Sequence, residues 1–99
     1  MSAHSLLERE IVDLLNSAGW FAWPSHSPRD LPAKPGMPDI LAVRDGRLLA
    51  VEVKVPPDKL SARQVDVIES LHQHGARVLV VTRLVEVEDF IRDHTKGGV

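Results

Sequence analysis

The fold of this chain is decided by residues 36–54, which read GMPDILAVRDGRLLAVEVK. Two apolar runs, at 40–43 and 48–51, are joined by Arg44-Asp45-Gly46-Arg47. Asp-Gly between two such runs is a strong signal for a β-hairpin. The second run leaves no continuous solvated face, which is typical of a strand in the middle of a sheet. The stretch therefore predicts a hairpin at the centre of a sheet.

Three charged residues do not belong in the core of such a hairpin: Asp39, Glu52 and Lys54. Because side chains alternate along a strand, Glu52 and Lys54 share a face about 6.6 Å apart, and Asp39 can meet Glu52 from the start of the neighbouring strand. Charged side chains are rarely buried unless they are paired or bind a metal. A surface hairpin with a cross-strand salt bridge stays open as an alternative, but a central strand favours a site for a divalent cation such as Mg²⁺.

The flanking segments predict the rest of an α/β fold. Residues 4–18 repeat apolar residues at helical spacing, Ser5 can cap the start of this helix, and Glu8 lies at the edge of its apolar stripe. The crossover from the hairpin to the last strand should leave these two strands parallel. We therefore expect a mixed central sheet with helices on both faces. The other predicted elements are a strand at 20–23, a helix between 61 and 75, a strand at 77–82 and a helix at 85–94.

Two features allow both a structural and a functional interpretation. The segment 24–37 holds four prolines, together with Arg29 and Lys34, and reads as an irregular loop. It is either a solvated connector or a basic cradle for a phosphate backbone. Ser61 and Gln64 match a capping box at the start of the second helix. Alternatively, Gln64 reaches the charged site from that helix start.

The tryptophans and histidines are given ordinary roles. Trp20 and Trp23 are both expected to pack in the core. A metal site built from histidines is not expected, because His72 and His74 do not share a helix face. The remaining histidines are scattered along the chain, at His4, His26 and His94.

Composition narrows the class of protein. The 99 residues suit one domain over 1–99, with 96–99 as a frayed tail, and the absence of cysteine excludes disulfides and thiolate metal ligands. A net charge of −2 argues against a generic basic binder of nucleic acid, although residues 29–63 carry seven basic and five acidic residues. No apolar run reaches the length of a membrane span. We expect a soluble cytoplasmic protein with no membrane partner, from a bacterium or a phage.

In order along the chain, Glu8, Pro38-Asp39 and Glu52-Val53-Lys54 resemble the signature of the PD-(D/E)XK nucleases. Within that superfamily, the stretch 36–39 together with Ser61-x-x-Gln64 is similar to the VRR-NUC branch, the virus-type replication-repair nucleases. The segment from Glu8 to Trp20 also resembles the opening of archaeal Holliday junction resolvases. The similarity covers residues 6–92, and Pro56-Pro57 after the lysine departs from the looser turn expected there.

The resemblance implies a restriction-endonuclease-like αβββαβ core and a metal-dependent nuclease. Asp39, Glu52 and the backbone carbonyl of Val53 would ligate Mg²⁺, with Mn²⁺ as a substitute, and Glu8 would bind the metal through water or ligate a second ion. Lys54 would orient the attacking water or stabilise charge on the phosphate. The catalytic set implied in this way is Glu8, Asp39, Glu52, Lys54 and Gln64.

The resemblance also implies DNA as the substrate. A homodimer that cuts a Holliday junction or other branched DNA is favoured, since two-fold symmetry matches a four-way junction. We expect basic residues beside the site to contact duplex DNA. Flaps, linear duplex or RNA stay open as alternative substrates, as does a non-catalytic DNA-binding module. The expected DNA contacts are Arg29, Lys34, Lys59 and Arg63.

Overall fold

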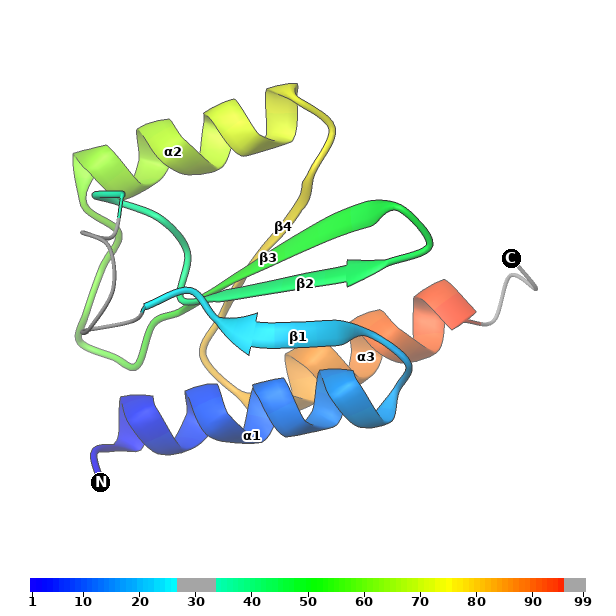
Figure 1. The fold of residues 1–99 in the computed structure, drawn as a ribbon. Helices are drawn as coiled ribbons and strands as arrows, with labels where there is room; N and C mark the ends of the chain where they lie inside the picture. The colour runs from blue at the N-terminus through cyan, green and yellow to red at the C-terminus, as the bar shows by residue number, and fades with distance from the viewer. Residues whose placement is uncertain (27–33, 96–99) are drawn as a thin grey trace.

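The computed structural model describes residues 1–26 and 34–95 (Figure 1). Within this part of the chain, four strands form one sheet in the order β1-β2-β3-β4. β1, β2 and β3 pair antiparallel in succession, and β4 runs parallel to β3. This mixed sheet and the order of its elements confirm the predicted fold class. The strands are β1 (Phe21–Pro24), β2 (Ile40–Arg44), β3 (Arg47–Val53) and β4 (Arg77–Val81).

The predicted hairpin is the centre of the sheet. β2 and β3 pair from Ile40 opposite Val51 to Arg44 opposite Arg47. Asp45 and Gly46 form the two-residue connection, and both have positive φ, at 52° and 76°. Two residues with positive φ are what the tight hairpin turn requires, which explains the Asp-Gly pair. β3 lies between β2 and β4, so the strand that carries Glu52 is an interior strand, as expected.

Helices lie on both faces of the sheet (Figure 1). α1 (Ala3–Ser17) and α3 (Leu84–Thr95) cover one face, and α2 (Ala62–Gln73) lies over the other. The core lies between the sheet and the helices α1 and α3. Alternate residues of β2 and β3 meet the apolar residues of these two helices there. This buried cluster includes Ile11, Leu15, Ala42, Leu49, Val51, Val53, Val87 and Phe90.

The face of the sheet on the α2 side is only partly covered. α2 has no buried residue. The strand register places Phe21 opposite Val43, and Trp23 opposite Leu41, on this face. Phe21 is 72% exposed and Trp23 is 36% exposed. The expectation that Trp23 packs in the core is therefore wrong, because none of the helices within residues 1–26 and 34–95 covers the β1 edge on this side. Trp20 does pack against the core, with its ring 6.1 Å from that of Phe90.

Helix α1 begins earlier than predicted. Its N-cap is Ser2, whose hydroxyl accepts a hydrogen bond from the Ser5 backbone N–H at 3.1 Å. The helix therefore includes His4 in its first turn, whereas the sequence suggested Ser5 as the cap. The capping box at the start of α2 is confirmed, with both Ser61 and Gln64 making the expected hydrogen bonds. No helix of the described residues is long and apolar enough to cross a membrane.

Candidate active site

Two buried carboxyl groups lie together at one end of the sheet. Asp39 immediately precedes β2, and Glu52 is the last residue but one of β3. Because β2 and β3 are antiparallel, with Ile40 opposite Val51, the start of one strand lies beside the end of the other. Asp39 is 7% exposed and Glu52 is 1% exposed. They are the buried charged side chains of the described residues, so the hairpin geometry predicted for this pair is present.

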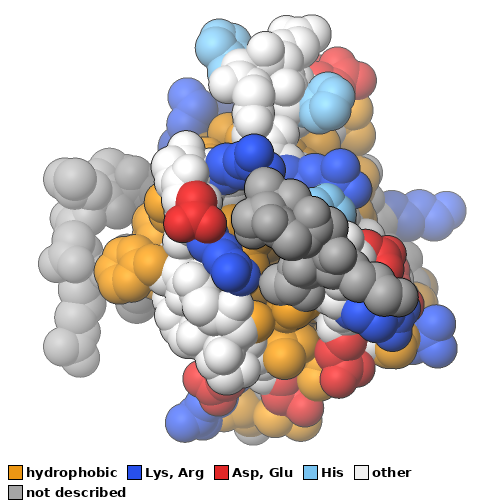
Figure 2. All heavy atoms as spheres, turned by 90° about the vertical axis from the view of Figure 1, so that its right-hand side faces the viewer, with side chains coloured by type: hydrophobic (Ala, Val, Ile, Leu, Met, Phe, Trp, Pro, Cys, Tyr) orange, Lys and Arg blue, Asp and Glu red, His pale blue; other side chains and the backbone are white. Residues whose placement is uncertain are grey.

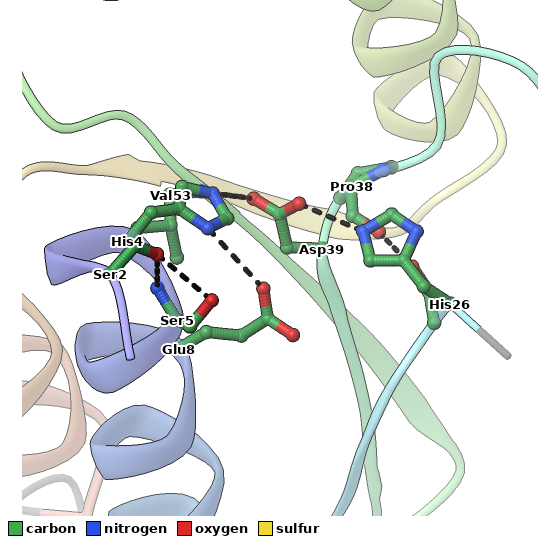
Figure 3. A network of polar contacts seen from close by, with 9 residues as sticks. Ser2, His4, Ser5, Glu8, His26, Pro38, Asp39 and Val53 are labelled. Atoms are coloured by element: carbon green, nitrogen blue, oxygen red, sulfur yellow. Dashed lines mark hydrogen bonds and ion pairs between the residues drawn. The ribbon is translucent and has the colours of Figure 1, made fainter. Parts of the chain in front are cut away.

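Asp39 is held by hydrogen bonds on both of its oxygens. Oδ2 accepts from the backbone N–H of Val53 at 2.8 Å, and Oδ1 lies 2.9 Å from Nε2 of His26. Its neighbour Pro38 accepts a hydrogen bond from the hydroxyl of Ser25 (Figure 3). Burial alone would raise the pKa of Asp39, but hydrogen bonds with Glu52, His26 and Val53 lower it below its ordinary value. Asp39 is therefore the ionised member of the buried pair.

Glu52 behaves in the opposite way. Burial, and then the hydrogen bond and negative charge of Asp39, raise its pKa to about 8. Its Oε2 atom is buried and has no hydrogen-bond partner among the described residues. A buried polar atom without a partner is rare and costs free energy. A divalent cation would satisfy this oxygen and remove the repulsion between the two carboxyl groups, so the donor set fits a metal that prefers oxygen ligands.

A third carboxyl group, carried by helix α1, lies near Asp39. Glu8 is half-buried, and its pKa is raised by burial and by the negative charge of Asp39. The structure thus brings Glu8 close to Asp39, with ligand atoms within 4.8 Å of each other, and Asp39 in turn adjoins Glu52. A common site for Glu8 and Glu52 stays a prediction. Figure 3 shows Glu8 pointing from the helix toward the start of β2.

Lys54 lies directly after β3, and its backbone N–H donates to the carbonyl of Val81 at 2.9 Å. The side chain is half-buried, and its positive charge lowers the pKa of Glu52, which places the ammonium group within electrostatic range of the carboxyl pair. Val53 contributes its N–H to Asp39, and its role as a carbonyl ligand stays a prediction.

Gln64 has a structural role at the start of α2. Its side-chain Oε1 atom accepts a hydrogen bond from the backbone N–H of Ser61 at 2.9 Å. The backbone N–H of Gln64 donates to the Ser61 hydroxyl at 3.1 Å. No hydrogen bond joins its side chain to Glu8, Asp39 or Glu52 in the described part of the chain. The catalytic role of Gln64 therefore stays a prediction beside an observed capping role.

Two histidines that sequence reasoning set aside lie against Asp39. His4 of α1 is 3.4 Å from Asp39 and 3.7 Å from Glu8, and His26 is 2.9 Å from Asp39. The spacing of His4 four residues before Glu8 was an available signal, because such residues share a helix face. His26 follows β1 by two residues, and the last residue of β1 pairs with Ile40, directly after Asp39.

The comparison with known protein families decides which family this is. The model of the VRR-NUC domain matches residues 1–83. The chain belongs to the VRR-NUC family. This is a family of metal-dependent nucleases, as the resemblance of the sequence motifs implied.

Solved structures agree with this VRR-NUC assignment. A structure described as a VRR_NUC domain matches with a TM-score of 0.73 and 23% identity, covering 93% of this chain and 97% of that chain. Hjc of Archaeoglobus fulgidus, a Holliday junction resolvase, matches with a TM-score of 0.59 and 27% identity, covering 80% of this chain and 67% of that one. Among curated proteins, no match to the sequence was found.

The residues of this VRR-NUC domain that are expected to contact DNA do not all lie at one place. Lys34 and Arg63 line one hollow of about 510 Å³ beside α2, and Lys59 is exposed between β3 and α2. Arg29 lies outside the described residues. Gly36 permits the close approach that forms this hollow: a Cβ atom there would lie 2.6 Å from Cγ of Arg63 and 2.9 Å from its carbonyl oxygen.

A second hollow of the VRR-NUC domain, of about 460 Å³, lies at the other end of the sheet, beside the turn between β2 and β3. Figure 2 faces this end, and Lys and Arg side chains gather near its middle. Arg44 donates to the carbonyl of Ala18 at 2.9 Å, and Arg77 lies over the ring of Phe90. No cluster of metal-binding side chains was found here among the described residues. The chemistry is therefore assigned to the end that carries Asp39.

Proposed function

We propose that this VRR-NUC domain is a metal-dependent endonuclease that hydrolyses phosphodiester bonds in branched DNA, including Holliday junctions. The observation that carries the proposal is the buried pair of Asp39 and Glu52, in which one Glu52 oxygen lacks a hydrogen-bond partner. Without a metal, a proton on Glu52, whose pKa is raised to about 8, lets the two carboxyl groups lie together. A cation would replace this proton and would also satisfy the Glu52 oxygen that has no partner. DNA hydrolysis in the cytoplasm of a bacterium or of a phage-infected cell is the corresponding biological setting.

The residues divide the chemical work. Asp39, Glu52, the carbonyl of Val53 and Glu8 would hold Mg²⁺, with Mn²⁺ as a substitute. When bound, the cation supplies positive charge that stabilises negative charge developing on the phosphate oxygens. Lys54 orients the attacking water or adds a second positive charge beside the phosphate. Gln64 would act from the start of α2 by turning its amide away from the capping box.

Phosphate contacts away from the reacting bond would position the DNA. Lys34 and Arg63 face a common hollow, and Lys59 lies on the connection that leads to it. Together with Arg29, these residues would contact the backbone without reading its sequence. Branched DNA is preferred over other substrates because the Archaeoglobus Hjc to which the chain is similar is a Holliday junction resolvase. Flaps, linear duplex and RNA are the alternative substrates.

A homodimer is part of the proposal. The open face of the sheet carries Phe21, Trp23, Val43 and Val80, each at least 36% exposed. The strand register places these four residues on the same face. Phe21, Trp23 and Val43 lie together on β1 and β2, whereas Val80 lies on β4, beyond the buried residues of β3. Exposed apolar residues that lie together, as on β1 and β2, are typical of a protein interface. Two copies joined by a two-fold axis would present two active sites, as cleavage of both strands at a junction requires.

The test is a cleavage panel of four-way junction, flap, linear duplex and RNA, each with Mg²⁺, with Mn²⁺ and with a chelator. We expect cleavage of the junction with either metal and none with the chelator. Asp39→Ala, Glu52→Ala and Lys54→Ala should abolish cleavage in proteins that still fold by circular dichroism. Cleavage that survives these changes would refute the assigned site. Tight junction binding without cleavage in either metal would instead favour a non-catalytic DNA-binding module.

A further inference from the structure

The imidazole of His4 lies between two of the carboxyl groups assigned to the metal. His4 is in the first turn of α1, one turn before Glu8. Its Nε2 atom is 3.4 Å from Oδ2 of Asp39, and its Nδ1 atom is 3.7 Å from Oε2 of Glu8. Figure 3 shows the ring directed toward both carboxyl groups. His4, Glu8 and Asp39 each offer one ligand atom within 4.8 Å of the other two.

These distances suit a shared cation better than direct hydrogen bonds. A hydrogen bond between nitrogen and oxygen typically has a length of about 2.7–3.2 Å. Adjacent ligands of an octahedral ion with bonds of about 2.1 Å are separated by roughly 3.0 Å, and opposite ligands by roughly 4.2 Å. The separations of His4 from Asp39 and Glu8 fall between these two values. The two separations start from different nitrogens of the ring, and only one nitrogen can bind a given cation. Because one ligand atom of each residue lies within 4.8 Å of the other two, a small rotation of the side chains would bring all three to bonding distance from one cation.

His26 differs from His4 in this respect. Its Nε2 atom is 2.9 Å from Oδ1 of Asp39, which is the length of a hydrogen bond. Carboxylate ligands of metals are commonly oriented by a second hydrogen-bonding group of this kind. His26 is therefore a positioning residue for Asp39, while His4 remains available as a ligand.

The nitrogen of His4 changes which ion the site prefers. Mg²⁺ binds oxygen ligands almost exclusively, whereas imidazole favours first-row transition ions. We propose that His4 is a nitrogen ligand of the metal centre, beside Glu8 and Asp39, and that this ligand makes the domain select Mn²⁺ over Mg²⁺. Mg²⁺ stays usable through the carboxyl groups. The proposal rests on the proposed function, because it requires a divalent cation at this site.

The test measures metal binding without DNA. Binding of Mn²⁺ to the full chain is titrated by electron paramagnetic resonance, and Mg²⁺ affinity is obtained by competition. Pulsed measurements on the Mn²⁺ complex report whether a nitrogen-14 nucleus is directly coordinated. The variants are His4→Ala, His26→Ala and, as a control on the exposed surface of α2, His72→Ala.

We expect His4→Ala to weaken Mn²⁺ binding by at least about tenfold and Mg²⁺ binding by less than about threefold, since only the nitrogen ligand is lost. The nitrogen-14 signal should disappear in this variant and persist in His26→Ala and His72→Ala. If His4→Ala does not fold, His4→Gln keeps a polar side chain on the helix but offers no imidazole, and the same loss of signal is expected.

Three results would overturn the proposal: a nitrogen signal that survives in the His4 variants, equal loss of Mn²⁺ and Mg²⁺ affinity, or loss of the signal only in His26→Ala. These results differ from failure of the proposed function. If the wild-type chain binds neither ion, or binds them unchanged in Asp39→Ala, the metal site itself is wrong. If it binds Mn²⁺ through His4 and cleaves no nucleic acid, the metal centre stands and the nuclease activity does not.

Discussion

The backbone N–H of Val53 donates to Oδ2 of Asp39 at 2.8 Å, so the strand that carries Glu52 also fixes the other carboxyl group of the pair. The two metal-binding candidates are therefore positioned by the hairpin itself and not by a flexible side chain alone. Asp39 therefore has a structural role, as the acceptor of the Val53 hydrogen bond, that can be tested separately from its proposed role as a metal ligand.

Asp39→Asn should keep the fold and lose the reaction. The amide oxygen can still accept from Val53, whereas the negative charge that binds a cation is gone. We expect cleavage to fall by at least about 100-fold, with the melting temperature within a few degrees of wild type. Asp39→Ala should lose a further 1–3 kcal/mol, as an order of magnitude, because the Val53 N–H is left without its acceptor. Cleavage by the Asn variant above one tenth of wild type would contradict this role.

Stability of the metal-free protein should fall as the pH rises. Glu52 has a pKa of about 8 in the folded chain and an ordinary value of 4.5 when exposed. Between these values the folded chain holds a proton that the unfolded chain has released, so the free energy of unfolding declines from about pH 5 to pH 8. Burial and the charge of Asp39 also raise the pKa of Glu8, which adds to this trend. Asp39 has a lowered pKa, so its titration changes the free energy of unfolding only at a pH below its ordinary pKa of 3.8.

The measurement is thermal unfolding in chelator at several pH values between 5.5 and 8.5. Glu52→Gln should flatten the decline, because it removes the titrating group. Added Mn²⁺ should raise the melting temperature more at pH 8 than at pH 6, because at the higher pH less of Glu52 carries the proton that competes with the metal. A pH dependence equal in wild type and Glu52→Gln would assign the effect to other groups.

Lys34 and Arg63 should act through the phosphate backbone. Lys34→Ala and Arg63→Ala are each expected to weaken binding of a catalytically dead variant to junction and linear DNA alike. Each should reduce the slope of log affinity against log salt by about one. Fluorescence anisotropy over a range of salt concentrations gives both quantities. A change in preference among substrates with an unaltered salt slope would point to a different role.

The open sheet face should hold the dimer together. Phe21→Asp replaces a side chain that is 72% exposed, so the fold should survive while the apolar contact is lost. Sedimentation should change from the mass of two chains to that of one. Val85→Asp is the matched control, because Val85 is also exposed, at 41%, but lies on α3 over the opposite face. A wild-type chain that sediments as a monomer would remove the dimer from the proposal.

Gly36 should tolerate a side chain less well than Gly75. Both have positive φ, at 82° and 96°, so alanine strains the backbone at either position. Only at Gly36 does the added Cβ meet a neighbour, Arg63, at 2.6 Å. Gly36→Ala should therefore lose about 1–3 kcal/mol more than Gly75→Ala in denaturant unfolding. Equal losses would mean that α2 shifts freely away from the preceding loop.

Much of the fold could be predicted because its signals are local. The Asp45-Gly46 turn, the capping box of Ser61 and Gln64, and the apolar strands are each visible within a few residues. The approach of Asp39 to Glu52 also followed, since antiparallel pairing relates the two positions directly. The approach of Glu8 to Asp39 needed the packing of α1 on the sheet, which the sequence suggested only through the helix stripe and the family resemblance.

The rest depended on packing between distant elements. The position of His4 follows from a helix that starts at Ser2, one turn before the expected cap, and His26 reaches Asp39 through the pairing of β1 with β2. Exposure of Trp23 depends on how far α2 extends over the sheet, which no strand pattern encodes. Gln64 fits both the capping-box pattern and the active-site motif, so the sequence around it does not distinguish the two roles.

Helix ends are the first parts of a helix to fray, and here the opening turn of α1 carries His4, which lies against the carboxyl groups of Glu8 and Asp39 that we propose as metal ligands. An affinity tag fused directly ahead of Met1 would sit next to that turn. Measured metal affinity and pH response should then vary with the tag, even though every residue of the site is intact. Tagging at the other terminus, with Ser2→Ala as a deliberate loosening of the cap, would separate this artefact from the chemistry of the protein.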